Sequence, residues 1–411
     1  MSRPPNIHSC PECASDQRLL RSSAWPSIDA AWSSSFKVVD LFSGCGGMSL
    51  GLALAATDYM RRLDVRLAVD FDSDAVAVFR RNFARFVDPA APGVLNSPVE
   101  KLIDGQLGRD PTPSERSLVA KVGSVDMLVG GPPCQGHSDL NNWTRRNDPR
   151  NRFYLRMARA VEILRPEAAL VENVAAVTRD KFGVVNTTIN HLEGLGYLVH
   201  AAVVDLSALG VPQTRKRHAL LAVSDRLGRE SAAKVIQNFY SSQITCSGRT
   251  TAWAIGDLIG SEGSSEFDAP ARASEENQRR IAWLFENGAY DLPDSQRPSC
   301  HRDKDHTYRS VYGRLSWHRP AQTITTGFTS MGQGRFVHPG RRRTITAHEA
   351  ARLQGFPDFF DFETGAARKR TAWSMLIGNA VPPNMTRAAA SCLLDAFAAR
   401  DSRPVFRAAS C

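Results

Sequence analysis

A short apolar run that ends in a glycine turn and is followed by a helical stretch most constrains the fold of this 411-residue chain. The run is residues 36–42, the turn is Ser43-Gly44-Cys45-Gly46-Gly47, and the helical stretch is residues 48–56. Glycines in such a turn let backbone N–H groups and a helix N-terminus approach a ligand closely. The pattern predicts the first half of a nucleotide-binding βαβ unit, although tight turns also use glycine for purely conformational reasons.

The alternation of apolar runs with helical stretches continues and predicts the fold class. Between two of the runs, apolar residues recur at helical spacing at Tyr154, Met157, Val161 and Leu164. Strands that alternate with helices imply an α/β fold with a doubly wound, mostly parallel sheet, in which ligands lie beyond the carboxyl ends of the strands. The further expected strands are residues 65–69, 125–129, 168–171, 197–204 and 219–223.

Polar residues follow these runs at the predicted ligand edge. Asp70 ends the second run, where an acid can bind ribose hydroxyls, and Ser73 is the expected cap of the next helix. Phe71 can stack on an adenine ring or pack in the core. Glu172 follows the run at residues 168–171. One edge of the sheet is therefore expected to collect the acids and the glycine turn.

The loop after residues 125–129 carries a cysteine among glycines and prolines, Gly130-Gly131-Pro132-Pro133-Cys134-Gln135-Gly136-His137-Ser138. Prolines lock their own φ angles and favour extended backbone before them, while glycines permit a sharp turn. This loop predicts a Cys134 thiol presented at a strand end. The alternative is a small buried core residue, the usual location of a free cysteine.

Composition narrows the class of protein. The formal net charge is +9, from 51 Lys and Arg against 42 Asp and Glu, which favours a polyanionic partner. Eight scattered cysteines in a chain of this length do not form a disulfide scaffold and favour a reducing cytoplasm. No apolar run is long enough to span a bilayer, and no signal peptide is expected.

Residues 1–36 are expected to be a flexible N-terminal tail. They contain Cys10-Pro11-Glu12-Cys13, half of the ligands of a zinc site, and the sequence holds no second Cys-x-x-Cys. No metal is therefore expected.

Several motifs occur in order and together resemble the motif series of the bacterial C5-cytosine-specific DNA methyltransferases. The resemblance extends over about residues 37–390. It implies the class I Rossmann-like methyltransferase fold. The motifs are Asp40-Leu41-Phe42-Ser43-Gly44-Cys45-Gly46-Gly47, Gly131-Pro132-Pro133-Cys134-Gln135, Glu172-Asn173-Val174, Gln213-Thr214-Arg215-Lys216-Arg217, Arg319-Pro320-Ala321-Gln322-Thr323-Ile324-Thr325-Thr326 and Gly378-Asn379-Ala380-Val381-Pro382-Pro383.

The resemblance implies covalent catalysis on a cytosine rotated out of duplex DNA. Cys134 would attack C6, and Glu172 would hold or protonate N3. Arg217 would contact the cytosine O2, and Arg215 would support Glu172 or a phosphate. Because alternate residues of an extended segment share a face, both guanidinium groups are expected to point into one pocket.

The resemblance also implies S-adenosylmethionine as the methyl donor. Asp70 would bind the ribose, Phe71 the adenine, and the turn the methionine end. The implied cofactor-binding residues are Phe42, Ser43, Gly44, Cys45, Gly46, Gly47, Asp70, Phe71, Asn379 and Val381. The chain departs from the family pattern at His137, where phenylalanine is usual, at Phe71, where tryptophan is common, and at Asn96-Ser97-Pro98-Val99, which lacks the usual aspartate.

The expected DNA contacts are Gln135, Ser138, Arg145 and Arg146, in a loop that the family closes over DNA. The expected organisation is a catalytic domain at residues 37–223, a target-recognition region at 224–340, and a C-terminal return at 341–411. In the target-recognition region, a helix is expected at 274–287. Thr346 and Glu349 predict a capping box on the helix through Leu353.

Three alternatives stay open, and each has a discriminating feature. A transfer-RNA cytosine-5 methyltransferase would have a different residue pair after Pro-Cys and a shorter variable region. A DNA-binding protein without catalysis would not require intact Cys134, Glu172, Arg217 and Asn379. A Rossmann dehydrogenase would leave Cys134 without a role. The favoured protein is a monomeric DNA (cytosine-5-)-methyltransferase of a bacterial cytoplasm, paired in function with a restriction endonuclease.

Overall fold

The computed structural model describes residues 4, 10–27, 29, 32, 34–133, 153–242, 249–260, 265–299, 302, 311–363 and 369–401. The chain forms two compact units, and each is described by itself. Unit 1 contains residues 1–25, 210–215 and 244–380. Unit 2 contains residues 26–209, 216–243 and 381–411.

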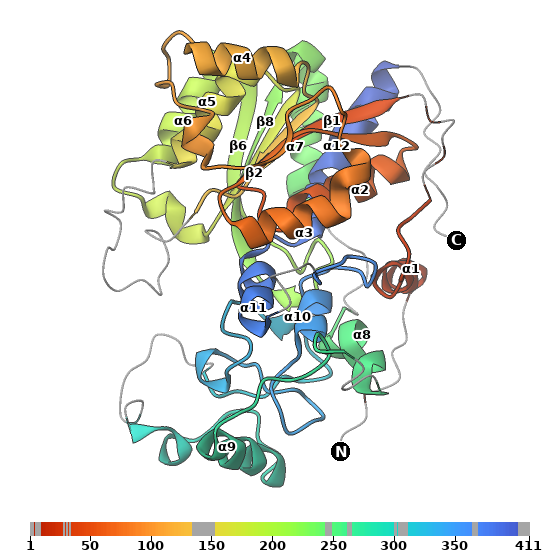
Figure 1. Cartoon of the computed structure of the whole chain (residues 1–411), viewed down its shortest axis with the longest axis vertical. Helices are drawn as coiled ribbons and strands as arrows, with labels where there is room; N and C mark the ends of the chain where they lie inside the picture. The colour runs from red at the N-terminus through yellow and green to blue at the C-terminus, as the bar shows by residue number, and fades with distance from the viewer. Residues whose placement is uncertain are drawn as a thin grey trace. The chain divides into compact units, whose positions relative to one another are not determined.

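Unit 2 is built on a seven-stranded sheet with the order β3-β2-β1-β4-β5-β8-β6. Figure 1 labels β1, β2, β6 and β8 of this sheet. All neighbouring pairs are parallel except those that β8 makes with β5 and β6, which are antiparallel. The predicted α/β fold with a mostly parallel sheet is therefore confirmed. The strands are β1 (Ser35–Leu41), β2 (Arg62–Asp70), β3 (Gly93–Asn96), β4 (Met127–Gly130), β5 (Ala168–Asn173), β6 (Tyr197–Asp205) and β8 (Lys216–Ser224).

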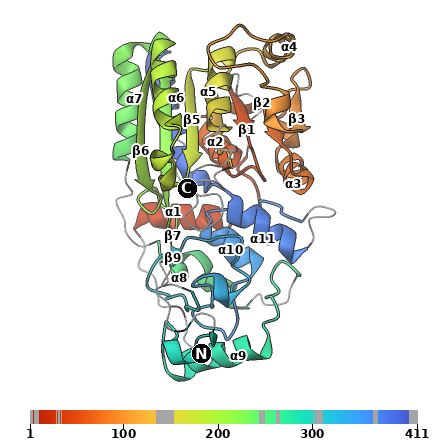
Figure 2. The ribbon, with the colours of Figure 1, turned by 90° about the vertical axis from the view of Figure 1, so that its left-hand side faces the viewer.

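Helices cover both faces of this sheet (Figure 2). The helices α2 (Gly47–Asp58), α7 (Arg229–Ser241) and α12 (Pro383–Arg400) pack together, as do α4 (Pro113–Val122), α5 (Phe153–Leu164) and α6 (Val184–Gly194). The helix α3 (Ser73–Phe83) packs on β2 and β3. Tyr154, Met157 and Val161, the residues at helical spacing, belong to the buried core under α5. These apolar residues form a stripe along one face of the helix, and burial of that stripe stabilises α5.

Local sequence sets where several helices begin. Asp72, and not the expected Ser73, caps α3, since its carboxylate accepts hydrogen bonds from the backbone of Asp74 and Ala75. Aspartate is among the strongest N-caps because its oxygen satisfies amide groups that the helix leaves unpaired. At Thr346 and Glu349 the expected capping box is present.

Unit 1 contains shorter elements and its own core. The helices are α1 (Pro11–Leu20), α8 (Thr251–Ile255), α9 (Glu275–Glu286), α10 (Ala347–Leu353) and α11 (Arg370–Asn379). The strands β7 (Gln213–Thr214) and β9 (Ala321–Gln322) form a parallel pair. The predicted helix at 274–287 is confirmed as α9, with Ser274 as its cap. A core cluster around α9 contains Ile281, Leu284, Leu292, Tyr312, Met331 and Val337.

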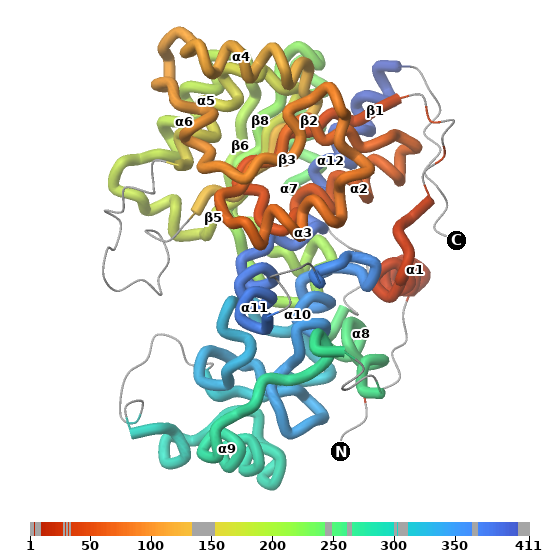
Figure 3. The backbone as a smooth tube through the Cα atoms, in the orientation of Figure 1, coloured from red at the N-terminus to blue at the C-terminus, as the bar shows by residue number. Residues whose placement is uncertain are grey.

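The amino-terminal segment differs from the expected flexible tail, because residues 11–20 form the helix α1 beside α8 (Figure 3). Cys13 and Leu20 are buried, and the carbonyl of Cys13 accepts a hydrogen bond from the indole of Trp253 at 3.0 Å. The side chain of Gln17 donates to the Trp253 carbonyl at 2.7 Å. Contacts distant in sequence therefore order a segment whose composition alone does not predict a helix.

The contact-defined units also differ from the expected domain boundaries. Residues 224–242, placed with the target-recognition region from sequence, belong to unit 2 and include α7 (Arg229–Ser241). Residues 341–380, expected to return to the catalytic domain, pack in unit 1. Within the described part of the chain, no helix is long and apolar enough to cross a membrane.

Candidate active site

The glycine turn after β1 has the left-handed backbone that its sequence favours. Gly44 and Gly46 have φ angles of +52° and +100°, and Gly46 caps α2. A Cβ on Gly46 would lie 2.4 Å from the ring of Phe83 on α3, so this backbone lies too close to α3 for a larger residue. Phe42 has a φ of +57°, which is strained for a residue with a side chain. Strain of this kind is concentrated at ligand-binding sites.

Asp70 connects this turn to the end of β2. Its Oδ2 accepts a hydrogen bond from the backbone of Gly44 at 2.8 Å, and its Oδ1 accepts one from the backbone of Asp72 at 2.9 Å. Burial raises the pKa of the Asp70 carboxyl, although these backbone hydrogen bonds oppose the rise. The carboxyl group expected to bind ribose is therefore held at the edge of the glycine turn.

Phe71 is presented to solvent at this edge, with 70% of its surface exposed. The side chain of Asn96, at the end of β3, donates to the carbonyls of Asp70 and Phe71 at 3.1 and 2.9 Å. Asn96 thus stabilises the turn that presents the ring, a role that the sequence did not indicate. An exposed aromatic ring on a braced turn suits stacking against a planar ligand.

Asp40 is a candidate functional residue that sequence reasoning missed. It lies in β1 just before the glycine turn, is fully buried, and accepts a hydrogen bond on Oδ2 from the Ser49 hydroxyl at 2.6 Å. Its Oδ1 has no hydrogen-bond partner among the described residues. Burial raises the pKa of Asp40 to about 7. A buried carboxylate oxygen without a partner needs a donor from a ligand or water, and its position directly before the turn was the available signal.

The predicted acid and one predicted arginine are brought together by β5 and β8. The Nε of Arg217 lies 2.9 Å from Oε1 of Glu172, and both side chains are largely buried. A Cβ on Gly131 would lie 3.1 Å from Oε2 of Glu172 and 3.5 Å from Cγ2 of Val381. Glu172 and Val381 therefore flank the backbone that leads to Cys134.

The second predicted arginine makes its described contacts within unit 1. Arg215 is buried and donates from Nη1 to the carbonyl of Ile324 at 3.2 Å. Gln213, beside it in β7, donates to the carbonyl of Leu353 and accepts from the backbone of Ile324. The Gln-x-Arg-x-Arg motif is therefore divided, with Arg215 in unit 1 and Arg217 in unit 2.

The Gly378-Asn379-Ala380-Val381 stretch is divided in the same way. Gly378 packs so closely on the Thr325–Thr326 backbone that a Cβ would lie 2.2 Å from the Thr326 nitrogen. Asn379 is exposed at the last position of α11, and Val381 belongs to unit 2. Glycine is thus required here by close approach of two backbones.

The predicted nucleophile and DNA contacts, Cys134, Gln135, Ser138, Arg145 and Arg146, lie outside the described residues. The described loop before them reaches Pro133, and the carbonyl of Pro132 accepts a hydrogen bond from the side chain of Asn173 at 3.3 Å. Within the described ranges, no group of three or more His, Cys, Asp or Glu side chains is placed to hold a metal ion.

Residues 36–394 match the family model of the C-5 cytosine-specific DNA methylases. The chain is 43% identical to the Type II methyltransferase M1.BsuMI of Bacillus subtilis (strain 168), over 90% of this chain and 83% of that protein. It is 31% identical to the Type II methylase M.HgiDII of Herpetosiphon aurantiacus, over 85% of this chain and 92% of that one. The S. pombe Dnmt2 methyltransferase has a similar fold, with a TM-score of 0.56 and 18% identity over 88% of this chain and 98% of that chain.

Proposed function

The chain belongs to the C-5 cytosine-specific DNA methylase family, and from that premise we propose which of its residues carry the reaction. It is a DNA cytosine-5 methyltransferase. One observation carries our assignment of the site. Glu172, paired with Arg217, packs against the backbone at Gly131, three residues before Cys134. This short connection supports placing the acid and the thiol in one pocket.

The chemistry begins with the Cys134 thiolate, because C5 of cytosine is a poor nucleophile until C6 is occupied. The sulfur forms a bond to C6, electrons move toward N3, and N3 takes a proton from Glu172. The activated C5 would then take the donor's methyl group, and the donor's sulfur would keep the electron pair of the broken S–CH3 bond and leave as a neutral thioether. A base removes the C5 proton, the C6–S bond breaks, and the proton on N3 returns to Glu172.

Arg217 keeps Glu172 in position and offers its remaining guanidinium N–H groups to the cytosine O2. The pair at 2.9 Å supports the first role, since a charged donor orients a carboxylate. Arg215 is proposed to support the same acid or a phosphate.

S-adenosylmethionine is the methyl donor that this family implies, and when bound it supplies an electrophilic methyl group. The residues present fit it. The partnerless Oδ1 of Asp40 suits the ammonium of its methionine end, and the exposed ring of Phe71 suits its adenine. Asp70 would accept from its ribose hydroxyls. Asn96 uses its amide N–H groups on Asp70 and Phe71, which leaves its side-chain oxygen for the adenine amino group. The turn residues Phe42, Ser43, Gly44, Cys45, Gly46 and Gly47 would line the methionine end. Asn379 and Val381 are proposed as further donor-binding residues on the family resemblance alone.

The DNA substrate is proposed to be a duplex from which the cytosine is rotated into the pocket, since stacking shields C5 and C6. Gln135, Ser138, Arg145 and Arg146 are proposed to contact it. We place sequence recognition in unit 1 around α9. The expected boundaries were 37–223 for the catalytic domain and 224–340 for target recognition. We propose instead that unit 2 is the catalytic unit and that unit 1 recognises the target.

The two relatives are named a Type II methyltransferase and a Type II methylase, which supports a role in modifying a restriction site. We propose that the enzyme acts as a monomer in a bacterial cytoplasm, without direct contact to a restriction endonuclease, and needs no metal.

The test is covalent trapping. The purified protein is incubated with tritiated S-adenosylmethionine and duplex DNA that contains 5-fluorocytosine. In this base a C–F bond replaces the C5–H bond, so no C5 proton can be removed and the C6–S bond cannot break. We expect a denaturation-stable protein–DNA adduct with the wild type and none with Cys134→Ser. An adduct that persists in Cys134→Ser would contradict the assignment of Cys134 as the nucleophile. Transfer RNA that contains 5-fluorocytosine, in place of the duplex DNA, tests the alternative substrate.

A further inference from the structure

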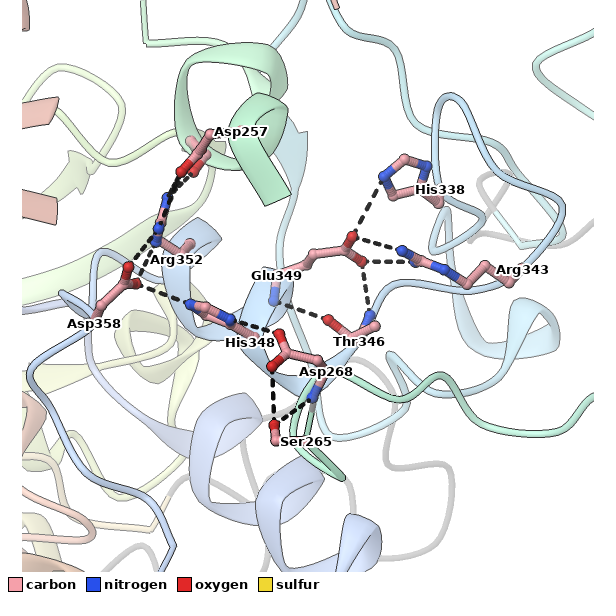
Figure 4. Close-up of polar contacts among 11 residues, drawn as sticks. Asp257, Ser265, Asp268, His338, Arg343, Thr346, His348, Glu349, Arg352 and Asp358 are labelled. Atoms are coloured by element: carbon pink, nitrogen blue, oxygen red, sulfur yellow. Dashed lines mark hydrogen bonds and ion pairs between the residues drawn. The ribbon is translucent and has the colours of Figure 1, made fainter. Parts of the chain in front are cut away.

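His348 lies between two carboxylates in the described part of unit 1. Its Nδ1 is 2.8 Å from Oδ1 of Asp268, and its Nε2 is 2.9 Å from Oδ1 of Asp358 (Figure 4). Both ring nitrogens can donate only when the imidazole is protonated. Because both partners are carboxylates, which accept and do not donate when ionised, this geometry selects the imidazolium form.

The charges continue on both sides of Asp358 in alternating sign. Arg352 forms a close ion pair with Asp358 and reaches Asp257 at 3.2 Å. Asp257 in turn lies 3.2 Å from Arg21, just after α1. With His348 protonated, this row of charged side chains holds three cations and three anions, which balance. A neutral imidazole would leave one net negative charge. The row of charged side chains joins five segments of unit 1, at residues 21, 257, 268, 348–352 and 358.

His348 also holds the backbone of the turn that carries Asp268. The backbone N–H of His348 donates to the carbonyl of Phe267 at 3.2 Å, and the two rings stack at 5.8 Å. Phe267 packs in addition on Phe362 and Trp373. Within the turn, the Ser265 hydroxyl donates to Asp268 at 2.9 Å. The segment from 265 toward α9 is therefore fastened to α10 by His348.

We propose that protonated His348 is a positioning residue for DNA recognition, which fastens the Ser265–Asp268 turn to α10 and so fixes the segment that carries α9. The proposal rests on the assignment of sequence recognition to unit 1. His348 touches neither DNA nor methyl donor in this scheme and acts through the turn. DNA binding should be tightest while the imidazole is protonated.

The direction of the pH dependence follows from the groups that face the ring. Burial and the repulsion from Arg352 lower the pKa of His348. The hydrogen bonds to Asp358 and Asp268 and the negative charge of Asp358 raise it, and the net effect is a pKa above its ordinary value of 6.5. Glu349, next along α10, is directed toward Arg343 and His338. A raised histidine pKa contributes stability that is full below the ordinary value and is lost as pH rises through the raised value.

The experiment measures KM for duplex DNA and kcat across that pH window for the wild type, His348→Gln and His348→Arg. We expect KM of the wild type to rise on the order of five-fold with pH while kcat changes little. His348→Gln should have the high KM at every pH. His348→Arg, which keeps a cation that can pair with both carboxylates, should keep the low KM and lose the pH dependence. The exposed His318→Gln serves as the matched control and should retain the wild-type profile.

Two further measurements separate this inference from the proposed function. Titration of ¹⁵N-histidine-labelled protein by NMR should give His348 a pKa above the ordinary value, and S-adenosylmethionine binding to His348→Gln should match the wild type if the variant is folded. The same KM profile in His348→Gln as in the wild type would overturn the positioning role, as would a His348 pKa at or below the ordinary value. A wild type that methylates no DNA overturns the proposed function instead, and the NMR titration still decides the charge state.

Discussion

The guanidinium Nε of Arg217 lies 2.9 Å from the carboxylate Oε1 of Glu172, on two strands that run antiparallel. Backbone register places Glu172 opposite Ala219, two residues beyond Arg217, so the two long side chains meet on one face of the sheet. The antiparallel course of β8 is what makes this possible. Because β8 runs antiparallel to β5, its first residues lie beside the carboxyl end of β5. Arg217, the last residue of the Gln-x-Arg-x-Arg motif, is therefore close to Glu172.

Glu172→Gln should lower kcat for methyl transfer by about 10²- to 10⁴-fold, the range for loss of a positioned proton donor. Arg217→Lys should lower it less, because a lysine keeps the charge but not the fork geometry. The measurement is single-turnover transfer of tritium to duplex DNA. Lys216→Ala, at the exposed neighbouring position, is the control and should behave as the wild type. Equal rates for Glu172→Gln and the wild type would contradict the proposed role of Glu172 as proton donor.

Asp40→Asn should weaken binding of S-adenosylmethionine by about ten-fold, the worth of one hydrogen bond to a charged group. The amide oxygen can still accept from Ser49, so the local fold should persist. Calorimetric titration of the donor measures the change. Unchanged affinity would show that Oδ1 faces water and not the ammonium.

The same variant tests a pH dependence of stability. Burial raises the pKa of Asp40 from 3.8 to about 7, so its contribution to stability is full below the lower value and is lost as pH rises through the upper one. We expect Asp40→Asn to lack this loss. Its free energy of unfolding relative to the wild type should therefore increase with pH and level off above about 7. Denaturant unfolding at several pH values measures the difference, and parallel pH profiles would contradict it.

Phe71→Ala should weaken donor binding by about ten-fold, within the range for loss of one stacked aromatic ring. Phe182→Ala is a matched control, since Phe182 is also an exposed phenylalanine of unit 2. Both variants should unfold at the same denaturant concentration as the wild type, because exposed rings contribute little packing. If both weaken binding equally, the effect does not arise from stacking at Phe71.

Gly51→Ala should lower the free energy of unfolding by about 2–3 kcal/mol, as expected of overpacking. Gly51 lies where α2 meets α12, and a Cβ there would lie 2.1 Å from the carbonyl of Pro383 and from the hydroxyl of Thr386. At Gly194, in the last turn of α6, a Cβ would meet nothing within 4 Å. Gly194→Ala should therefore be neutral or slightly stabilising. Chemical denaturation measures both, and equal effects would contradict the close helix contact.

Leu20→Ala should destabilise unit 1 by about 2–4 kcal/mol, since the side chain of Leu20 is buried at the end of α1. Arg18→Ala, at an exposed position of the same helix, should change stability by less than about 0.5 kcal/mol. Thermal unfolding measures the pair. Indistinguishable melting temperatures would mean that α1 is not part of the folded unit.

Local sequence patterns predicted several elements of both units, because those elements depend on residues that are neighbours along the chain. The glycine turn, the helical spacing of α5 and the capping box at Thr346 each involve residues within a few positions of one another. The course of β8 and the docking of α1 were not predictable in this way. They depend on contacts between segments up to hundreds of residues apart, such as Gln17 with Trp253.

By itself, the sequence determined the order of the motifs, the α/β class and the residue types available for catalysis. These features depend on the residue types and their positions along the chain, and not on contacts between distant segments. Only the tertiary structure decided which of those residues meet. It paired Glu172 with Arg217, left one oxygen of Asp40 buried without a described partner, and placed His348 between Asp268 and Asp358. The physical reason is that burial and charge pairing depend on three-dimensional neighbours, and those neighbours set the protonation states that the chemistry requires.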